Sequence, residues 1–148
     1  MKSSSPTTPN ILLVDESRDG LLVRRAVLEE IGCRVEIAAT SEEGLKLYKA
    51  GTFDVVVTDH RVPGLNGIEL IARLRTVNPN ARIILVCGLI EPLGLTEDNT
   101  GADAVLAKNA KEPVQLGRMV KRLISRGPAR KPPAKQGRVT ARARAGAR

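Results

Sequence analysis

Short apolar runs alternate with amphipathic segments along most of this chain. The runs hold four to six residues each, which is typical of strands buried on both faces of a parallel sheet. They are Ile11–Val14, Arg34–Ala38, Phe53–Thr58, Arg82–Cys87 and Ala104–Ala107. Short links and helical spacing between the runs predict helices on both faces of that sheet. The pattern therefore predicts a doubly wound α/β domain with five parallel strands.

Apolar positions recur at helical spacing in segments 21–31, 40–49, 66–77 and 113–123. The first segment includes Leu22 and Val23 among its apolar positions. The boundaries of these four segments carry signals typical of helix starts and ends. Thr40 with Glu43 predicts a capping box, Asn66 predicts an N-cap, Gly32 and Asn78-Pro79 predict helix ends, and Pro113 predicts the start of the last helix. We expect four regular helices here.

Residues 89–100 occupy the place where a further helix is due. They contain Pro92, Gly94, Asn99 and several other residues that disfavour helix interiors. Pro costs about 3 kcal/mol and Gly about 1 kcal/mol relative to Ala inside a helix. We therefore expect this fourth helix to be short or distorted, which brings the expected number of helices to about five.

The net charge of +8 lies mainly at the C-terminal end. Residues 127–148 hold seven Lys or Arg and no acid, whereas residues 1–126 hold 17 basic and 16 acidic side chains. This composition predicts a flexible leader over 1–9, a folded domain over 10–126 and a disordered basic tail over 127–148. The tail is expected to be a solubilising extension, to contact nucleic acid or another acidic surface, or to bind an acidic protein.

Composition also excludes some classes of function. Aromatic residues make up only 1% of the 148 residues, so base stacking on aromatic rings is nearly excluded as a binding mode. No segment approaches 18 consecutive apolar residues, and the N-terminus does not resemble a secretion signal. The sequence therefore predicts no membrane span.

Charged residues follow directly after three of the predicted strands. Asp15 and Glu16 follow the first, Asp59 the third and Lys108 the fifth. Because the carboxyl ends of parallel strands meet at one edge of the sheet, we expect these side chains to lie close together. Clustered carboxylates need a cation, and hard oxygen ligands suit Mg²⁺. Singly, each acid could cap a loop or helix, but jointly they predict a metal-assisted phosphoryl site with a carboxylate nucleophile.

The chain resembles the receiver domain of bacterial two-component response regulators. The matching segments are Ile11–Glu16, Asp59–Gly67 with its Pro63, Gly101–Asp103, and Lys108, in the expected order and spacing. The resemblance implies a flavodoxin-like fold, with strands in the order 2-1-3-4-5 and about five helices.

The resemblance also implies roles for individual residues. Asp59 would accept a phosphoryl group from a histidine kinase, a phosphotransfer protein or a small phosphodonor. Asp15, Glu16, Asp59 and the backbone carbonyl of Arg61 would hold Mg²⁺, and Lys108 would contact the acyl phosphate. A downstream protein partner would carry the output. The chain is not expected to be a turnover enzyme, because only self-phosphorylation and autodephosphorylation are implied.

Several positions depart from the pattern of this family. Cys87 stands where a Thr or Ser hydroxyl usually senses the phosphoryl group, and a thiol is a weaker donor. Val105 stands where a Tyr or Phe ring usually moves. Asn109 follows Lys108 in place of a cis-proline, so either a strained cis bond or a different, trans backbone is expected. Glu16 replaces a more frequent Asp.

These departures leave two functions open. One is a single-domain response regulator that signals from phosphorylated Asp59. The other is a phosphorylation-independent pseudo-receiver, with polyanion binding through the tail as a further role. The strand order also places Cys33 and Cys87 three strands apart, roughly 14 Å, which is too far for a disulfide. Reduced thiols fit a cytoplasmic location.

Overall fold

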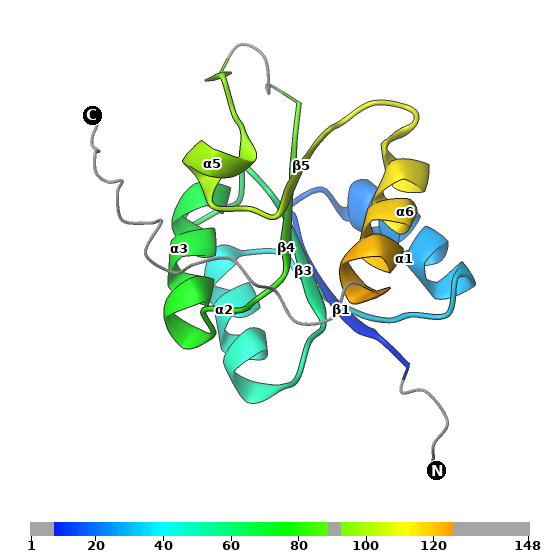
Figure 1. Ribbon diagram of the computed structural model, residues 1–148, viewed down its shortest axis with the longest axis horizontal. Helices are drawn as coiled ribbons and strands as arrows, with labels where there is room; N and C mark the ends of the chain where they lie inside the picture. The colour runs from blue at the N-terminus through cyan, green and yellow to red at the C-terminus, as the bar shows by residue number, and fades with distance from the viewer. Residues whose placement is uncertain (1–7, 89–92, 126–148) are drawn as a thin grey trace.

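A parallel sheet lies at the centre of the computed structural model, which describes residues 8–88 and 93–125. The sheet has five strands in the order β2-β1-β3-β4-β5 (Figure 1). The strands are β1 (Asn10–Val14), β2 (Arg34–Ala38), β3 (Val55–Asp59), β4 (Ile83–Cys87) and β5 (Ala104–Ala107). The predicted fold class and strand order are confirmed.

Helices cover both faces of the sheet. On one side lie α1 (Arg18–Glu30) and α6 (Glu112–Ser125), and on the other lie α2 (Ser41–Ala50), α3 (Gly67–Val77) and α5 (Glu97–Thr100) (Figure 1). Alternate residues of each strand enter opposite cores: Ile11 and Leu13 pack in the cluster beneath α1 and α6, whereas Leu12 and Val14 pack in the other. The central strands are therefore mainly apolar, as is typical of parallel strands buried on both faces.

Helix starts follow their capping signals with one difference. The Thr40 hydroxyl accepts a hydrogen bond from the Glu43 N–H at 3.1 Å. The Glu43 carboxylate, however, accepts from the N–H of Ala39, so the predicted reciprocal box does not form there. A reciprocal box forms instead at the start of α3, between Asn66 and Glu69.

The third strand starts later than predicted. It begins at Val55 and includes Asp59, whereas the apolar run suggested a strand from Phe53 to Thr58. Just before this strand, the Asp54 carboxylate accepts a hydrogen bond from the Asn10 N–H at the start of β1, at 2.7 Å. Asp59 is thus the last residue of the strand rather than the first residue of the loop.

The segment expected to hold a weak fourth helix divides into two parts. Residues 89–92 lie outside the described residues, and the rest contains α5, only four residues long. Thr96 caps α5, and Gly101 ends it with a φ of 81°, a conformation that favours glycine. The predicted leader, except Thr8 and Pro9, and the predicted tail also lie outside the described residues.

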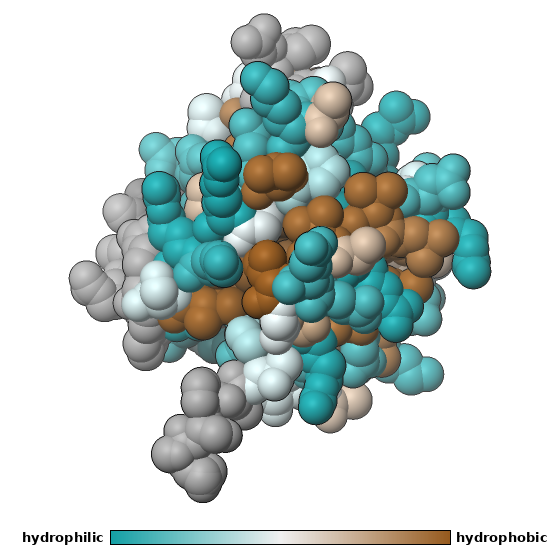
Figure 2. All heavy atoms as spheres, turned by 90° about the vertical axis from the view of Figure 1, so that its right-hand side faces the viewer, coloured by the Kyte–Doolittle hydropathy of each residue, from teal (hydrophilic) through white to brown (hydrophobic). Residues whose placement is uncertain are grey.

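The outer face of α1 and α6 carries apolar side chains among charged ones (Figure 2). Leu22 and Val23, which the sequence groups with the apolar positions of this helix, are 45% and 50% exposed. The buried residues of α1 are Leu21, Arg24 and Leu28. A charged residue therefore lies in the buried stripe of α1, while two apolar neighbours face outward.

Two further predictions can be compared with the structure. Cys33 and Cys87 are both buried and are not joined by a disulfide, as the strand order predicts. Within the described residues, no helix has both the length and the apolar character needed to cross a bilayer.

Candidate functional site

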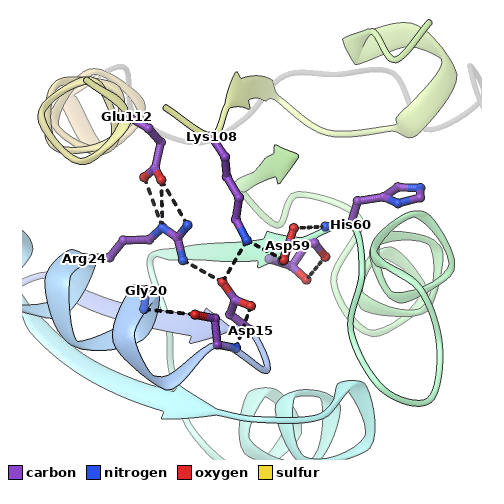
Figure 3. A network of polar contacts seen from close by, with 9 residues as sticks. Asp15, Gly20, Arg24, Asp59, His60, Lys108 and Glu112 are labelled. Atoms are coloured by element: carbon purple, nitrogen blue, oxygen red, sulfur yellow. Dashed lines mark hydrogen bonds and ion pairs between the residues drawn. The ribbon is translucent and has the colours of Figure 1, made fainter. Parts of the chain in front are cut away.

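Asp59 lies at the carboxyl edge of the sheet, where β3 ends. Its side chain is buried, with the residue 8% exposed. Its Oδ1 accepts a hydrogen bond at 2.8 Å from the N–H of His60, which also donates to the Val86 carbonyl of β4. The His60 ring points away from Asp59 (Figure 3). The backbone of the neighbouring residue thus fixes the carboxylate, while the imidazole takes no part.

Asp15 follows β1 at the same edge. Val14 pairs in register with Thr58, so the next residue of each strand is a carboxylate: Asp15 beside Asp59. The Asp15 N–H donates to the Ala38 carbonyl of β2, and its Oδ1 accepts from the Ser17 N–H at 3.0 Å. The parallel register therefore brings together two of the predicted site residues.

Lys108 joins the two carboxylates. Its Nζ lies 2.8 Å from Asp59 Oδ2 and 3.5 Å from Asp15 Oδ2 (Figure 3). Its backbone N–H donates to the Cys87 carbonyl, which continues the pairing of β5 with β4 for one more residue. No cis peptide bond occurs among the described residues, so the bond between Lys108 and Asn109 is trans. The trans backbone delivers the ammonium to both carboxylates.

A second cation contacts Asp15 from the side of α1. Nη1 of Arg24 lies 2.7 Å from Asp15 Oδ2. The same guanidinium holds Glu112, the first residue of α6, with Nε at 3.2 and 3.1 Å from its two oxygens and Nη2 at 3.0 Å from Oε1. Glu112, Arg24, Asp15, Lys108 and Asp59 thus form a continuous row of alternating charges (Figure 3).

The two carboxylates have opposite electrostatic environments. Burial alone would raise the pKa of Asp15, but the Ser17 N–H, the Arg24 guanidinium and the Lys108 ammonium hold this pKa below its ordinary value. Burial raises the pKa of Asp59 above its ordinary value, and the charge of Asp15 adds to the effect, although Lys108 opposes it. The Asp59 charge therefore still lacks full compensation, which a bound cation would supply.

The donor set fits Mg²⁺ through Asp15 and Asp59. Among the described residues, no three Asp, Glu, His or Cys side chains lie close enough together to hold a metal ion. Mg²⁺ commonly takes one or two protein carboxylates and completes its shell with water and phosphate oxygen, so two carboxylates suffice. Glu16 is exposed and is not brought into a group of three with them. Glu16 and the carbonyl of Arg61, also an exposed residue, stay predicted ligands.

The two atypical positions lie where the strand pairing puts them. Cys87 is buried at the end of β4, opposite Ala107 of β5. Val105 is partly buried and packs against the core cluster on the side of α2 and α3. Cys87 carries a thiol and Val105 an aliphatic side chain, so neither position offers a hydroxyl or an aromatic ring.

Arg24 and Glu112 are absent from the sequence-based set of site residues. The signal that identifies Arg24 is its spacing, three residues after Leu21 and four before Leu28, which places it in the buried stripe of the helix. A buried Arg requires an acidic partner. Glu112, just before Pro113, offers no comparable signal, because acidic residues are common in the first turn of any helix.

Known proteins resemble this chain over most of the folded region. A model of the response regulator receiver domain matches residues 11–121. The virulence sensor protein BvgS of Bordetella bronchiseptica is 38% identical over 76 residues, covering 49% of this chain and 6% of that protein. The aerobic respiration control sensor protein ArcB of Escherichia coli is 29% identical over 116 residues, covering 76% of this chain and 15% of that protein. The chain thus spans a small part of these relatives.

Solved structures show the same architecture. The CheY-like response regulator receiver domain protein of Methanospirillum hungatei aligns with a TM-score of 0.71 at 29% identity, covering 80% of this chain and 96% of that one. The response regulator TrrA of Thermotoga maritima, in complex with Mg²⁺ and BeF, aligns with a TM-score of 0.70 at 27% identity, covering 78% and 99%. With the family model matched over 11–121 of 148 residues, the chain belongs to the response regulator receiver domain family.

Proposed function

We propose that Asp59 accepts a phosphoryl group and that the chain acts as a single-domain response regulator. The observation that carries this proposal is the contact of Lys108 Nζ with Asp59 Oδ2 at 2.8 Å, with Asp15 sharing the same ammonium. An acceptor carboxylate, a second carboxylate for a metal and a fixed cation are the parts that this chemistry needs.

The reaction is a transfer of the phosphoryl group from a donor atom to a carboxylate oxygen. An oxygen of Asp59 bonds to phosphorus while the bond from phosphorus to the donor breaks, and the bonding electrons leave with the donor. The donor is the imidazole of a phosphohistidine or the carboxylate of acetyl phosphate. The Lys108 ammonium then faces the new acyl phosphate and offsets its charge. Asp15 and Asp59 would hold Mg²⁺, which would supply further positive charge to the phosphoryl oxygens.

Incubation with Mg²⁺ and acetyl phosphate should add the mass of one phosphoryl group, measured on the intact protein. Asp59→Asn should abolish the addition, because an amide is not a nucleophile for this transfer. Asp98→Asn is the matched control, since Asp98 is an exposed carboxylate in α5 and should leave the addition unchanged. If neither acetyl phosphate nor a phosphorylated histidine donor adds this mass, the proposal is wrong.

The output route is the second part of the proposal. Cys87 and Val105 replace the usual hydroxyl and ring, so the signal reaches the downstream protein partner by another path. A pseudo-receiver is the competing function, favoured by the same two residues. The two functions differ in Asp59→Asn: it removes phosphorylation-dependent partner binding from a response regulator and leaves the partner affinity of a pseudo-receiver unchanged.

The donor partner in this proposal is a histidine kinase or phosphotransfer protein, and the location is the cytoplasm, where such donors and reduced thiols occur together. The only reactions that we propose for the protein itself are self-phosphorylation and autodephosphorylation. It does not turn over an external substrate.

The basic tail supports a separate contact with a polyanion such as nucleic acid. Residues 127–148 carry seven basic side chains and no acidic ones. Their removal should abolish binding to duplex DNA at low salt and leave the thermal unfolding midpoint of the domain unchanged. Since counterion release drives such binding, the affinity of the full chain should fall steeply between about 50 and 200 mM salt, by roughly 10³-fold for about six phosphate contacts. DNA binding that does not depend on salt concentration, or that remains after residues 127–148 are removed, would contradict this role.

A further inference from the structure

Arg24 and Glu112 are buried charges that the phosphoryl chemistry itself does not require. Arg24 is 5% exposed and Glu112 is 4% exposed. Three hydrogen bonds join the guanidinium of Arg24 to the carboxylate of Glu112, and a fourth joins it to Asp15 (Figure 3). The pair thus connects a predicted metal ligand with the first residue of α6.

Buried charges of this kind carry a large desolvation cost. Replacing such a group by apolar residues is often neutral or even stabilising, so its presence is weak evidence for a purely structural role. Arg24, Asp15 and Asp59 also border the same small gap between side chains, which has no room for a water molecule. A function at the site is therefore the better explanation for burying a guanidinium there.

Arg24 occupies a position in which its guanidinium would compete with a metal ion for the Asp15 carboxylate. Its Nη1 contacts Oδ2 at 2.7 Å, the oxygen that Lys108 also approaches. A metal at Asp15 and the guanidinium repel each other, and in a buried setting that repulsion is poorly screened. Glu112 reduces the repulsion, because its negative charge directly contacts the same guanidinium.

The same contacts link the two outer helices. Arg24 belongs to α1 and Glu112 begins α6, four residues after Lys108 in the chain. If Arg24 binds Asp15 more weakly and Glu112 more strongly, or the reverse, the contact between α1 and α6 changes as well. Leu22 and Val23 of α1 are exposed, and apolar side chains lie among charged ones on the side of the molecule that α1 and α6 form (Figure 2).

We propose that Arg24 is a positioning residue that couples Mg²⁺ binding at Asp15 to the contact between α1 and α6. In this coupling, the Glu112 carboxylate offsets the positive charge of Arg24. The coupling rests on the proposed function for its ligand, since it requires Mg²⁺ at Asp15. It gives the site an output route that does not pass through Cys87 or Val105. Coupling of two equilibria is reciprocal, so a change at Glu112 must alter the metal affinity even though Glu112 contacts only Arg24 in this row.

A double-mutant cycle on Mg²⁺ affinity tests the coupling. The four proteins are the unmodified chain, Glu112→Gln, Arg24→Gln and the double variant, each titrated with Mg²⁺ alone and followed by backbone amide NMR. Glu112→Gln leaves the full charge of Arg24 facing the metal and should weaken Mg²⁺ binding about 5-fold, at the lower end of typical coupling. In the Arg24→Gln background the same change should alter the affinity by less than about 2-fold, because the charge that Glu112 offsets is gone.

A spectroscopic readout separates coupling from a merely structural role. The side-chain Nε–H resonance of Arg24 and the amides of the first turn of α6 should shift as Mg²⁺ binds to the unmodified chain. Thermal unfolding shows which variants are folded. If either Gln substitution prevents folding, the cycle is repeated with Arg24→Lys and Glu112→Asp, and the same sign of non-additivity is expected.

The possible failures are distinguishable. If Glu112→Gln changes the Mg²⁺ affinity equally in both backgrounds, or tightens it, the coupling is wrong while the proposed function stands. If the unmodified chain shows no Mg²⁺ binding at all, the coupling and the metal part of the proposed function are both overturned.

Discussion

At the scale of single residues, two buried carboxylates at one edge of the sheet are made unequal by their partners. Asp15 accepts hydrogen bonds from Ser17 and Arg24 and also faces Lys108, so its charge is well compensated. Asp59 faces Lys108 and one backbone N–H, and it also meets the charge of Asp15. The proposed acceptor is thus the carboxylate whose charge is less stabilised, while the proposed metal ligand Asp15 is held ionised.

This inequality predicts opposite effects on stability for two matched variants. The pKa of Asp15 is lower in the folded chain than its ordinary value, so its ionised form stabilises the fold above that value, and this contribution is lost as the pH falls through the folded pKa. Asp15→Asn should therefore lower the unfolding free energy at pH 7, and this loss should shrink at acidic pH.

Asp59 has the opposite sign. Its pKa is raised in the folded chain, so its ionised form costs stability above the folded pKa, and this cost disappears as the pH falls below the ordinary value of 3.8. Asp59→Asn should raise the unfolding free energy at pH 7 and have little effect near pH 3. Urea unfolding of both variants without Mg²⁺, at both pH values, measures this. Two losses of equal size at pH 7 would contradict the electrostatic account.

Sequence reasoning reached Asp15, Asp59 and Lys108 because each lies at the end of an apolar run, and strand ends in a parallel sheet meet. It did not reach Arg24 or Glu112, since their partnership depends on how two helices, far apart in the chain, pack together. Glu16 was expected at the site because it follows Asp15. It is exposed, and among the described residues it forms no group of three with the two buried carboxylates, so its role as a metal ligand stays a prediction.

At the scale of elements, the start of α3 determines the shape of the loop after Asp59. Gly67 begins α3, and its N–H donates to the His60 carbonyl at 2.8 Å. A Cβ at this position would lie 2.6 Å from the Asp59 carbonyl oxygen and 2.8 Å from Leu85 Cδ1. Only glycine allows the helix to approach the end of β3 this closely.

Gly67→Ala should therefore lower the unfolding free energy by about 1 to 3 kcal/mol through overpacking against backbone that cannot move aside. It should also slow phosphoryl uptake by Asp59, because the loop beside the acceptor is displaced. Gly88→Ala is the matched control for stability, since an added Cβ there meets nothing within 4 Å. Urea unfolding measures the difference, and equal stability of the two variants would contradict the close approach.

The helices also show how far local patterns reach. Several capping residues and helix ends were readable, because Thr40, Asn66 and Gly32 act through bonds or backbone conformations within a few residues. The inward face of α1 was not readable from apolarity alone. Leu22 is apolar but exposed, and Arg24 is charged but buried, since its ion pairs with two carboxylates compensate its desolvation.

At the scale of the whole molecule, the parallel sheet gathers the ends of β1, β3 and β5 at one edge, and the helical layers cover its two faces (Figure 1). The row of charges from Glu112 to Asp59 runs from the α1 and α6 layer into this edge. In the proposed function, receiving a phosphoryl group and passing the signal onward thus depend on different parts. Acceptance rests on Asp59, Lys108 and Asp15, while the output path departs from the usual one.

The most direct test of the account is an NMR comparison of the full chain with and without beryllium fluoride and Mg²⁺, which together mimic an acyl phosphate. The account predicts large shifts for the amides of His60 and Lys108 and further shifts at the start of α6, whereas in Asp59→Asn beryllium fluoride should add no shift to those that Mg²⁺ alone causes. Spectra that do not change on addition of beryllium fluoride and Mg²⁺, in a folded and unmodified chain, would contradict the central claim that Asp59 is a phosphoacceptor.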